Sequence, residues 1–126
     1  MKLQVTLSSI FISLFLNNVY AASLEASACK NALDKGDAIT ALKQAEKALN
    51  NNNKEVDALI CQGRALAATT KLDSALSSFK QANNLSTDAF EKTIATLLIG
   101  RTYHALKQDD LAIASFQQSL ENAKAA

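Results

Sequence analysis

The chain contains the stretch Thr70-Lys-Leu-Asp-Ser-Ala-Leu-Ser-Ser-Phe-Lys-Gln-Ala82 and repeats it, with changes, on either side. The upstream copy is Gly36-Asp-Ala-Ile-Thr-Ala-Leu-Lys-Gln-Ala-Glu-Lys-Ala48, and the downstream copy is Lys107-Gln-Asp-Asp-Leu-Ala-Ile-Ala-Ser-Phe-Gln-Gln-Ser119. The three copies begin 34 and 37 residues apart. A period in this range is typical of proteins that stack one supersecondary unit on the next. The sequence therefore predicts a stacked-repeat architecture.

Length and composition indicate one small helical domain. The chain has 126 residues, 48% of them hydrophobic but only 6% aromatic, and it has no proline, which together favour close-packed helices. The 13 basic and 12 acidic residues give a formal net charge of +1. Such a balance produces no long-range field that would gather nucleic acid or an anionic membrane, so neither partner is expected.

Residues 1–22 have the features of a secretory signal peptide. Met1-Lys2 is a basic start, residues 3–16 form an uncharged and mostly apolar run, and Val19-Tyr20-Ala21 precedes the expected cleavage after Ala21 or Ala22. The mature domain is then expected to comprise residues 23–126, exported to the bacterial periplasm and not inserted in a membrane.

Two alternatives to a cleaved signal are disfavoured. The apolar run would span only about 21 Å as a helix, less than the roughly 30 Å core of a bilayer, so it is short for an uncleaved anchor. A lipoprotein would need Cys29 as the lipidated residue, but Glu25 interrupts the segment that leads to it.

After Ser23, apolar residues recur at helical spacing and no segment alternates with a period of two, which predicts helices only. Glycine at position 36 and Asp37 are expected to end one helix and cap the next. Six helices are predicted. The first is marked by Leu24, Ala28 and Ala32, the second covers residues 38–49, the third 54–68 and the fourth 72–83. The fifth runs from the caps at 86–88 to about 106, and the sixth begins at 109.

The repeated pattern resembles the tetratricopeptide repeat, a helix-turn-helix unit of 34 residues. The resemblance covers residues 22–126, with repeats at about 22–55, 56–89 and 93–126, and implies an all-α fold of three stacked repeats in a short right-handed superhelix. The residues that match the small or aromatic packing positions of the family are Cys29, Gly63, Gly100, Ala41, Ala75, Ala112, Ala48, Ala82, Ser119, Phe79 and Phe116.

The three repeats do not match the family pattern equally well. The first is the weakest, because Ala45 stands where the later copies have phenylalanine. The second interval is three residues longer than the first, which is expected to lengthen the fifth helix by about a turn.

In this family the first helix of each repeat lines a concave groove that binds other proteins. Carried onto this chain, the groove positions place a row of basic residues above apolar ones, which suits a segment with acidic side chains. The alternative is that these are ordinary solvated residues on helix faces. The expected groove residues are Lys30, Arg64, Arg101, Asp57, Ile60, Leu97 and His104.

One recognition mode of the family is not supported. Co-chaperone members grip a C-terminal carboxylate with lysine, asparagine and arginine side chains. The corresponding positions here hold Ala26, Lys30, Cys61, Ile94 and Leu98.

The residues give no support for catalysis, a metal site or a cofactor. His104 is the only histidine, and no nucleophile elbow, phosphate-binding glycine loop or CxxC motif is present. The chain is therefore not expected to be an enzyme.

The two cysteines are candidates for a disulfide in an exported protein. On the repeat pattern, however, Cys29 is expected to face its own repeat and Cys61 the groove. Because side chains that point apart oppose a bridge, free cysteines are favoured, with the bridge left open.

Two functions fit these features. The first is an exported adaptor that binds a protein or peptide segment in its groove. The second is a structural subunit of a homodimer or envelope complex that has no peptide ligand and assembles through its terminal helix. That helix carries Ile113, Phe116 and Leu120 at spacings of three and four, and no further helix follows to cover them.

Overall fold

The structure, a computed structural model, describes residues 22–126, so the predicted signal peptide lies outside it except for Ala22. All regular structure in the described residues is helical, which confirms the all-α prediction for this part of the chain. The six helices are α2 (Leu24–Asp34), α3 (Ala38–Asn51), α4 (Val56–Ala68), α5 (Leu72–Leu85), α6 (Ala89–Ala105) and α7 (Asp109–Ala125).

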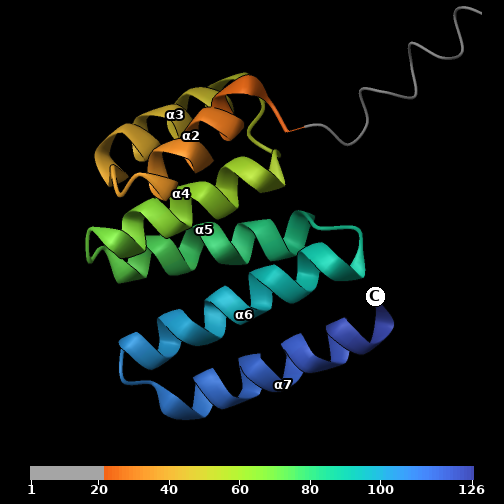
Figure 1. Cartoon of the computed structure of the whole chain (residues 1–126). Coiled ribbons are helices and arrows are strands. Elements are labelled where there is room, and N and C mark those ends of the chain that lie inside the picture. Colours follow the sequence, from red (N-terminus) through yellow and green to blue (C-terminus); the bar gives the residue numbers. More distant parts are fainter. Residues whose placement is uncertain (1–21) are drawn as a thin grey trace, which may run out of the picture.

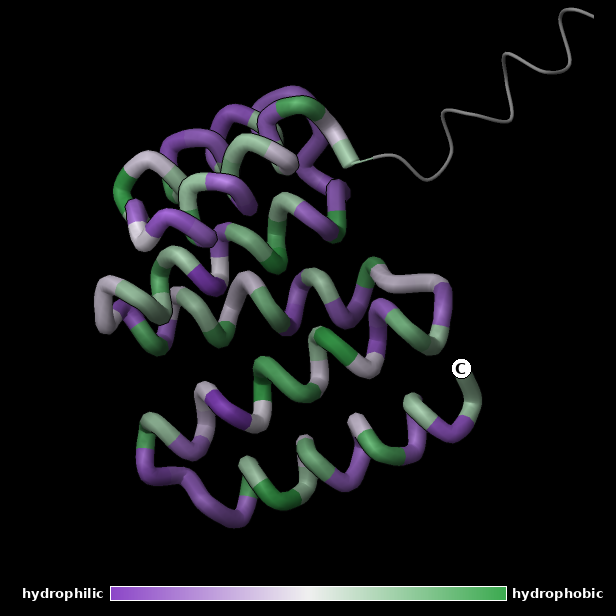
Figure 2. Tube along the Cα trace, viewed as in Figure 1, coloured by the Kyte–Doolittle hydropathy of each residue, from purple (hydrophilic) through white to green (hydrophobic). Residues whose placement is uncertain are grey.

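Consecutive helices pack side by side in chain order, with α2 and α3 at one end and α7 at the other (Figure 1). In addition, α2 packs directly on α4. Polar and apolar residues are mixed along every helix (Figure 2), as expected when each helix buries one stripe against its neighbours. No helix within residues 22–126 has both the length and the apolarity needed to cross a bilayer.

Helix starts follow from local side-chain hydrogen bonds. Asp37 accepts from the Thr40 N–H at 2.9 Å, and Asp88 accepts from the main-chain N–H of Glu91 at 2.8 Å, so both predicted caps are confirmed. The third helix begins two residues later than predicted. The Asn52 side chain accepts from the Lys54 N–H at 3.1 Å, which holds Lys54 in a turn instead of a helix.

The three copies of the repeated stretch begin with the same turn. Their first residues, Gly36, Thr70 and Lys107, have φ angles of 76°, 61° and 62°. In each turn this residue donates to the carbonyl three positions back, and the next residue donates to the carbonyl five positions back. Thr70 and Lys107 thus adopt a left-handed conformation that glycine adopts at lower cost.

Helices of each pair approach closely where small residues line the crossing. Ala41, Ala75 and Ala112 are all buried. A Cβ atom added to Gly63 would lie only 2.4 Å from the Phe79 ring. The aromatic ring therefore occupies the space that a side chain at this glycine would need.

The same contact recurs between the last two helices, where a Cβ atom added to Gly100 would lie 2.6 Å from the Phe116 ring. The two rings differ in their surroundings, because Phe79 is 1% exposed and Phe116 is 37% exposed. The predicted lengthening of the fifth helix is also confirmed, since α6 has 17 residues and α4 has 13.

We expect Gly63→Ala to destabilise the protein more than Gly100→Ala. Phe79 is almost fully buried, so overpacking at Gly63 should lower the free energy of unfolding by about 1–3 kcal/mol. Phe116 can swing toward solvent, and the helix propensity of alanine, about 1 kcal/mol better than glycine, should offset the remaining strain at Gly100. Urea denaturation of both variants measures the difference; equal stabilities would contradict the packing argument.

Candidate binding groove along α4

A groove runs along α4, with α2 on one side and α6 on the other. It consists of three connected pockets of about 310, 380 and 360 Å³. The first two share Asp57, Ile60 and Ile94, and the second and third share Arg64. Because neighbouring pockets share lining residues, they lie next to one another, and they are together called here the α4 groove.

Three basic side chains line the α4 groove, each from a different helix. Lys30 lies on α2 and Arg64 on α4, and both border the middle pocket. Arg64 also borders the third pocket, together with Arg101 of α6. All three residues are exposed. A ligand in the middle and third pockets would therefore meet a row of cations.

Apolar side chains lie between these charges. Ile60 and Ile94 line the middle pocket, while Leu98 and the Phe79 ring line the third. Phe79 comes from α5, so the floor of the third pocket is formed by the helix behind α4 and α6. The groove thus combines apolar contact area with cationic side chains, which is the usual make-up of a peptide-binding surface.

The opposite end of the α4 groove is acidic. Asp57, Asp88 and Glu91 line the first pocket beside the exposed ring of Phe90. Partial burial and the neighbouring Asp88 carboxylate raise the pKa of Glu91, against a hydrogen bond from Thr87 that lowers it. The charge of the groove therefore changes along its length: it is acidic beside the start of α4 and basic beside the end of α4.

Two predicted groove residues do not line the α4 groove. Leu97 is 42% exposed and borders none of the three pockets, and neither does His104. His104 Nδ1 instead lies 3.0 Å from Asp109 Oδ1 across the turn between α6 and α7. Among the described residues, α4 is the helix that faces α6 across the groove, and the side of α6 toward α4 carries Ile94, Leu98 and Arg101.

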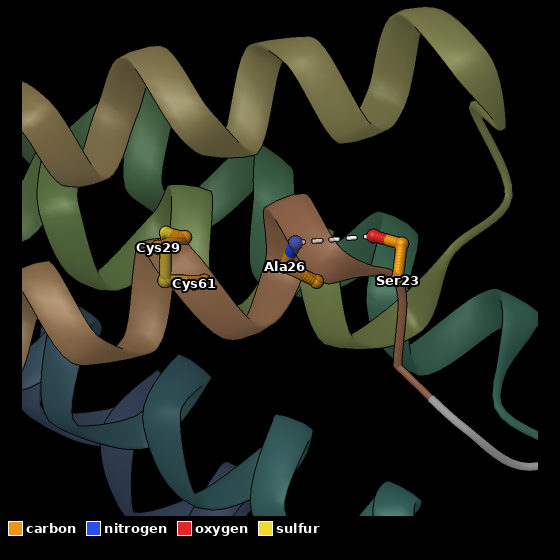
Figure 3. Close-up of a disulfide and its surroundings, with 4 residues drawn as sticks. All are labelled: Ser23, Ala26, Cys29 and Cys61. Carbon is orange, nitrogen blue, oxygen red and sulfur yellow. Dashed lines mark hydrogen bonds between the residues drawn. A yellow bond between two sulfur atoms is a disulfide. The ribbon is translucent and has the colours of Figure 1, made fainter.

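The prediction of free cysteines is wrong, because Cys29 and Cys61 form a disulfide that joins α2 to α4 (Figure 3). Their Cα atoms are 6.3 Å apart. Cys61 does border the middle pocket of the groove, but it is only 5% exposed. Because α2 packs directly on α4, Cys29 lies against it, so the error lay in expecting the two side chains to point apart. The bridge also leaves Cys29 without a free thiol for lipidation.

The disulfide lies in the core that the first helix pair shares with α4. Cys29 and Cys61 pack in one buried cluster with Ala41, Ala45 and Ala65. Cys29 occupies the position of Gly63 and Gly100 in the sequence pattern, and Ala45 that of the phenylalanines. The sulfur atoms thus supply volume in the one helix pair that lacks an aromatic ring.

Sequence reasoning missed the first pocket. Its distinctive residues, Phe90 and Glu91, belong to the extra turn of α6, which projects beside the start of α4. The lengthened interval between repeats predicted this turn but not the surface it forms. Phe90 could have indicated this pocket, because it is an aromatic residue in the inserted segment and is not needed to fill the core between repeats.

No other chemistry is apparent in the part of the chain that the structure describes, where no three His, Cys, Asp or Glu side chains are grouped to hold a metal ion. Comparison with models of known families finds no match for this chain, and a search of curated proteins finds none either.

Loss of the disulfide should destabilise the protein by about 3–4 kcal/mol, since it closes a loop between residues 32 positions apart. The Cys29→Ala/Cys61→Ala double variant avoids leaving a lone thiol and should show this loss in urea denaturation. Reduction of the wild type should reproduce it, while leaving the double variant unchanged. A wild type whose unfolding midpoint does not respond to reductant would contradict the stabilising role.

Proposed function

We propose that this chain is an exported adaptor of the tetratricopeptide type, which binds a segment of another protein in the α4 groove. The observation that carries the proposal is that Lys30, Arg64 and Arg101, equivalent residues of the three predicted repeats, line one groove. Equivalent positions of stacked repeats lie in a row, and here the apolar side chains of Ile60 and Leu98 lie beside the charges in the same pockets.

The family assignment is supported by features of both sequence and structure. The copies of the repeated stretch share one turn geometry, and the glycine–aromatic contact occurs in two of the three helix pairs. Three repeats of this kind, stacked in a right-handed superhelix, would place α2, α4 and α6 on the concave side. The proposed activity is binding alone, with no catalysis and no cofactor.

The polarity of the α4 groove restricts the ligand. A uniformly acidic segment would meet Asp57 and Glu91 at one end, and a uniformly basic one would meet Arg64 and Arg101 at the other. The segment that fits has apolar residues for the pockets beside Ile60 and Leu98, with acidic side chains near the cationic row. Charge complementarity of this kind selects among partners more than it adds raw affinity.

Export is part of the proposal, and the start of α2 is compatible with cleavage of the signal beside it. The Ser23 N–H donates to Glu55 Oε1 at 2.7 Å, and its hydroxyl accepts from the Ala26 N–H at 3.0 Å (Figure 3). Cleavage after Ala22 would convert the Ser23 N–H to an ammonium group facing a carboxylate, which strengthens such a bond.

The groove proposal predicts charge-selective peptide binding. A fluorescein-labelled synthetic peptide in which Leu alternates with Glu in one half and with Ser in the other should bind at low salt, and its Lys-for-Glu counterpart should bind more weakly. Replacing Lys30, Arg64 and Arg101 together by glutamine should weaken binding of the acidic peptide at least about tenfold, because the cations that face it are lost. Fluorescence anisotropy measures both effects.

The matched control replaces Lys47, Lys54 and Lys107, which are exposed and line none of the groove pockets, with the same change in net charge. This control variant should bind as the wild type does. Equal loss in both triple variants would assign the effect to net charge, and undiminished binding in both would exclude a role for the row.

The export proposal predicts processing. When the full chain is produced in a bacterium with a general secretory pathway, the protein recovered from the periplasm should lack residues 1–21 or 1–22. Intact-mass measurement identifies the cleavage site and, from the loss of two hydrogen atoms, an oxidised Cys29–Cys61 pair. An unprocessed, reduced protein confined to the cytoplasm would contradict export.

A further inference from the structure

We propose that the chain forms an antiparallel, twofold-symmetric dimer through one face of α7. This inference is independent of peptide binding, because no residue of α7 lines the α4 groove. It rests on the exposed apolar face of the last helix and on the charges that flank it.

The inner face of α7 is already occupied by α6, the one helix with which it packs extensively. Ala112 and Ser119 are buried there, and the Ser119 hydroxyl donates to the Thr93 carbonyl at 2.9 Å. Farther along, the Asn122 amide donates to the Thr96 hydroxyl at 3.3 Å. These contacts fix the rotation of α7 and therefore which side chains face outward.

A second face carries an uncovered apolar stripe. Ile113 and Leu120 are 56% and 57% exposed, and Phe116 between them is partly exposed. Asp109 precedes the stripe and Lys124 follows it at helical spacing, so all five residues share one face. This face, with Asp109, Ile113, Phe116, Leu120 and Lys124, is called here the α7 face.

The α7 face is complementary to itself when two copies run antiparallel. Ile113 and Leu120 lie at equal distances, in residues, from the Phe116–Gln117 bond, and so do Asp109 and Lys124. In a twofold contact, each member of such a pair meets the other in the second copy. The apolar residues would thus meet at the centre, and a carboxylate would meet an ammonium group at both ends.

The alternative arrangements lack this match. A parallel pair would place Asp109 beside Asp109 and Lys124 beside Lys124, with like charges opposed. Head-to-tail stacking would need an apolar stripe at the other end of the molecule, where Leu24 and Ile39 are exposed singly on two different helices. Charge complementarity therefore favours a second copy in the antiparallel orientation.

Existing ion pairs do not prevent this contact. Asp109 lies 3.0 Å from His104, and Lys124 lies 3.0 Å from Glu121. All four side chains are largely exposed to solvent. Exposed pairs of this kind contribute little to stability, so both charges can exchange partners on dimerisation.

The test is the oligomeric state of the purified processed chain, from residue 22 or 23 to 126, measured by sedimentation equilibrium across a dilution series. The wild type should be a dimer that dissociates on dilution. Leu120→Glu should raise the dissociation constant at least about tenfold, because it introduces a charge at the centre of the contact. Ile39→Glu, at an exposed apolar position on α3, is the control and should leave the dimer unchanged.

Charge reversal tests the orientation. Asp109→Lys and Lys124→Glu should each weaken the homodimer, since each opposes like charges at both ends. Mixing the two variants should restore association as a heterodimer, in which every end again pairs opposite charges. Asp109 and Lys124 are exposed, as are Leu120 and Ile39, so all four variants should keep the wild-type circular dichroism spectrum.

Four outcomes would overturn the proposal. A wild type that stays monomeric throughout the dilution series would exclude the proposed dimer. A dimer that Leu120→Glu leaves intact would show that the contact does not use the α7 face. Charge-reversed variants that fail to associate when mixed would exclude the antiparallel orientation. Oligomers larger than a dimer that are lost in Ile39→Glu would indicate head-to-tail stacking instead of the twofold contact.

Discussion

The structure depends on how closely the two helices of a pair can approach. Where Phe79 lies against Gly63, an aromatic ring fills the space that a side chain at the glycine would take, and the buried alanines on either side allow the backbones to come together. This contact sets the position of α4 relative to α5. The α4 groove is lined by both of these helices, so its depth follows from the same packing.

The first helix pair reaches a similar packing by different chemistry. It has alanine in place of phenylalanine, and a core of alanines alone buries little apolar surface. The disulfide between Cys29 and Cys61 adds sulfur atoms to that core and ties the pair to α4 covalently. A bridge of this kind suits an oxidising compartment, which agrees with the signal-like start of the sequence. The two cysteines of the chain therefore compensate for the missing aromatic ring in the repeat that matches the pattern least well.

The period of the sequence predicted six helices and most of their boundaries because each boundary is set locally, as with the Asp37 and Asp88 caps. The predictions that depended on contacts between repeats were less accurate. The pattern placed Cys61 at the groove and Cys29 within its own repeat, but the packing of α2 on α4 brings the two side chains together. The pattern also treated Leu97 and His104 as groove residues, although a groove needs two walls and, among the described residues, α4 is the one helix that faces α6 across the groove. The sequence specifies which face a residue takes on its own helix, but the neighbouring helix decides whether that face is enclosed.

The two halves of the α4 groove differ in how they can respond to a ligand. On one side, α2 packs on α4 and is bonded to it through the disulfide, so the distance between these walls is fixed covalently. On the other side, α6 has no comparable packing against α4, and the two are held through α5, whose Phe79 forms the floor between them. A ligand that widens the groove would therefore displace α6 and α7 together, because these two helices share the most extensive contact in the described residues. If segments bind in the groove as proposed, the Lys30 side would stay in position and adjustment to different segments would fall on the Arg101 side.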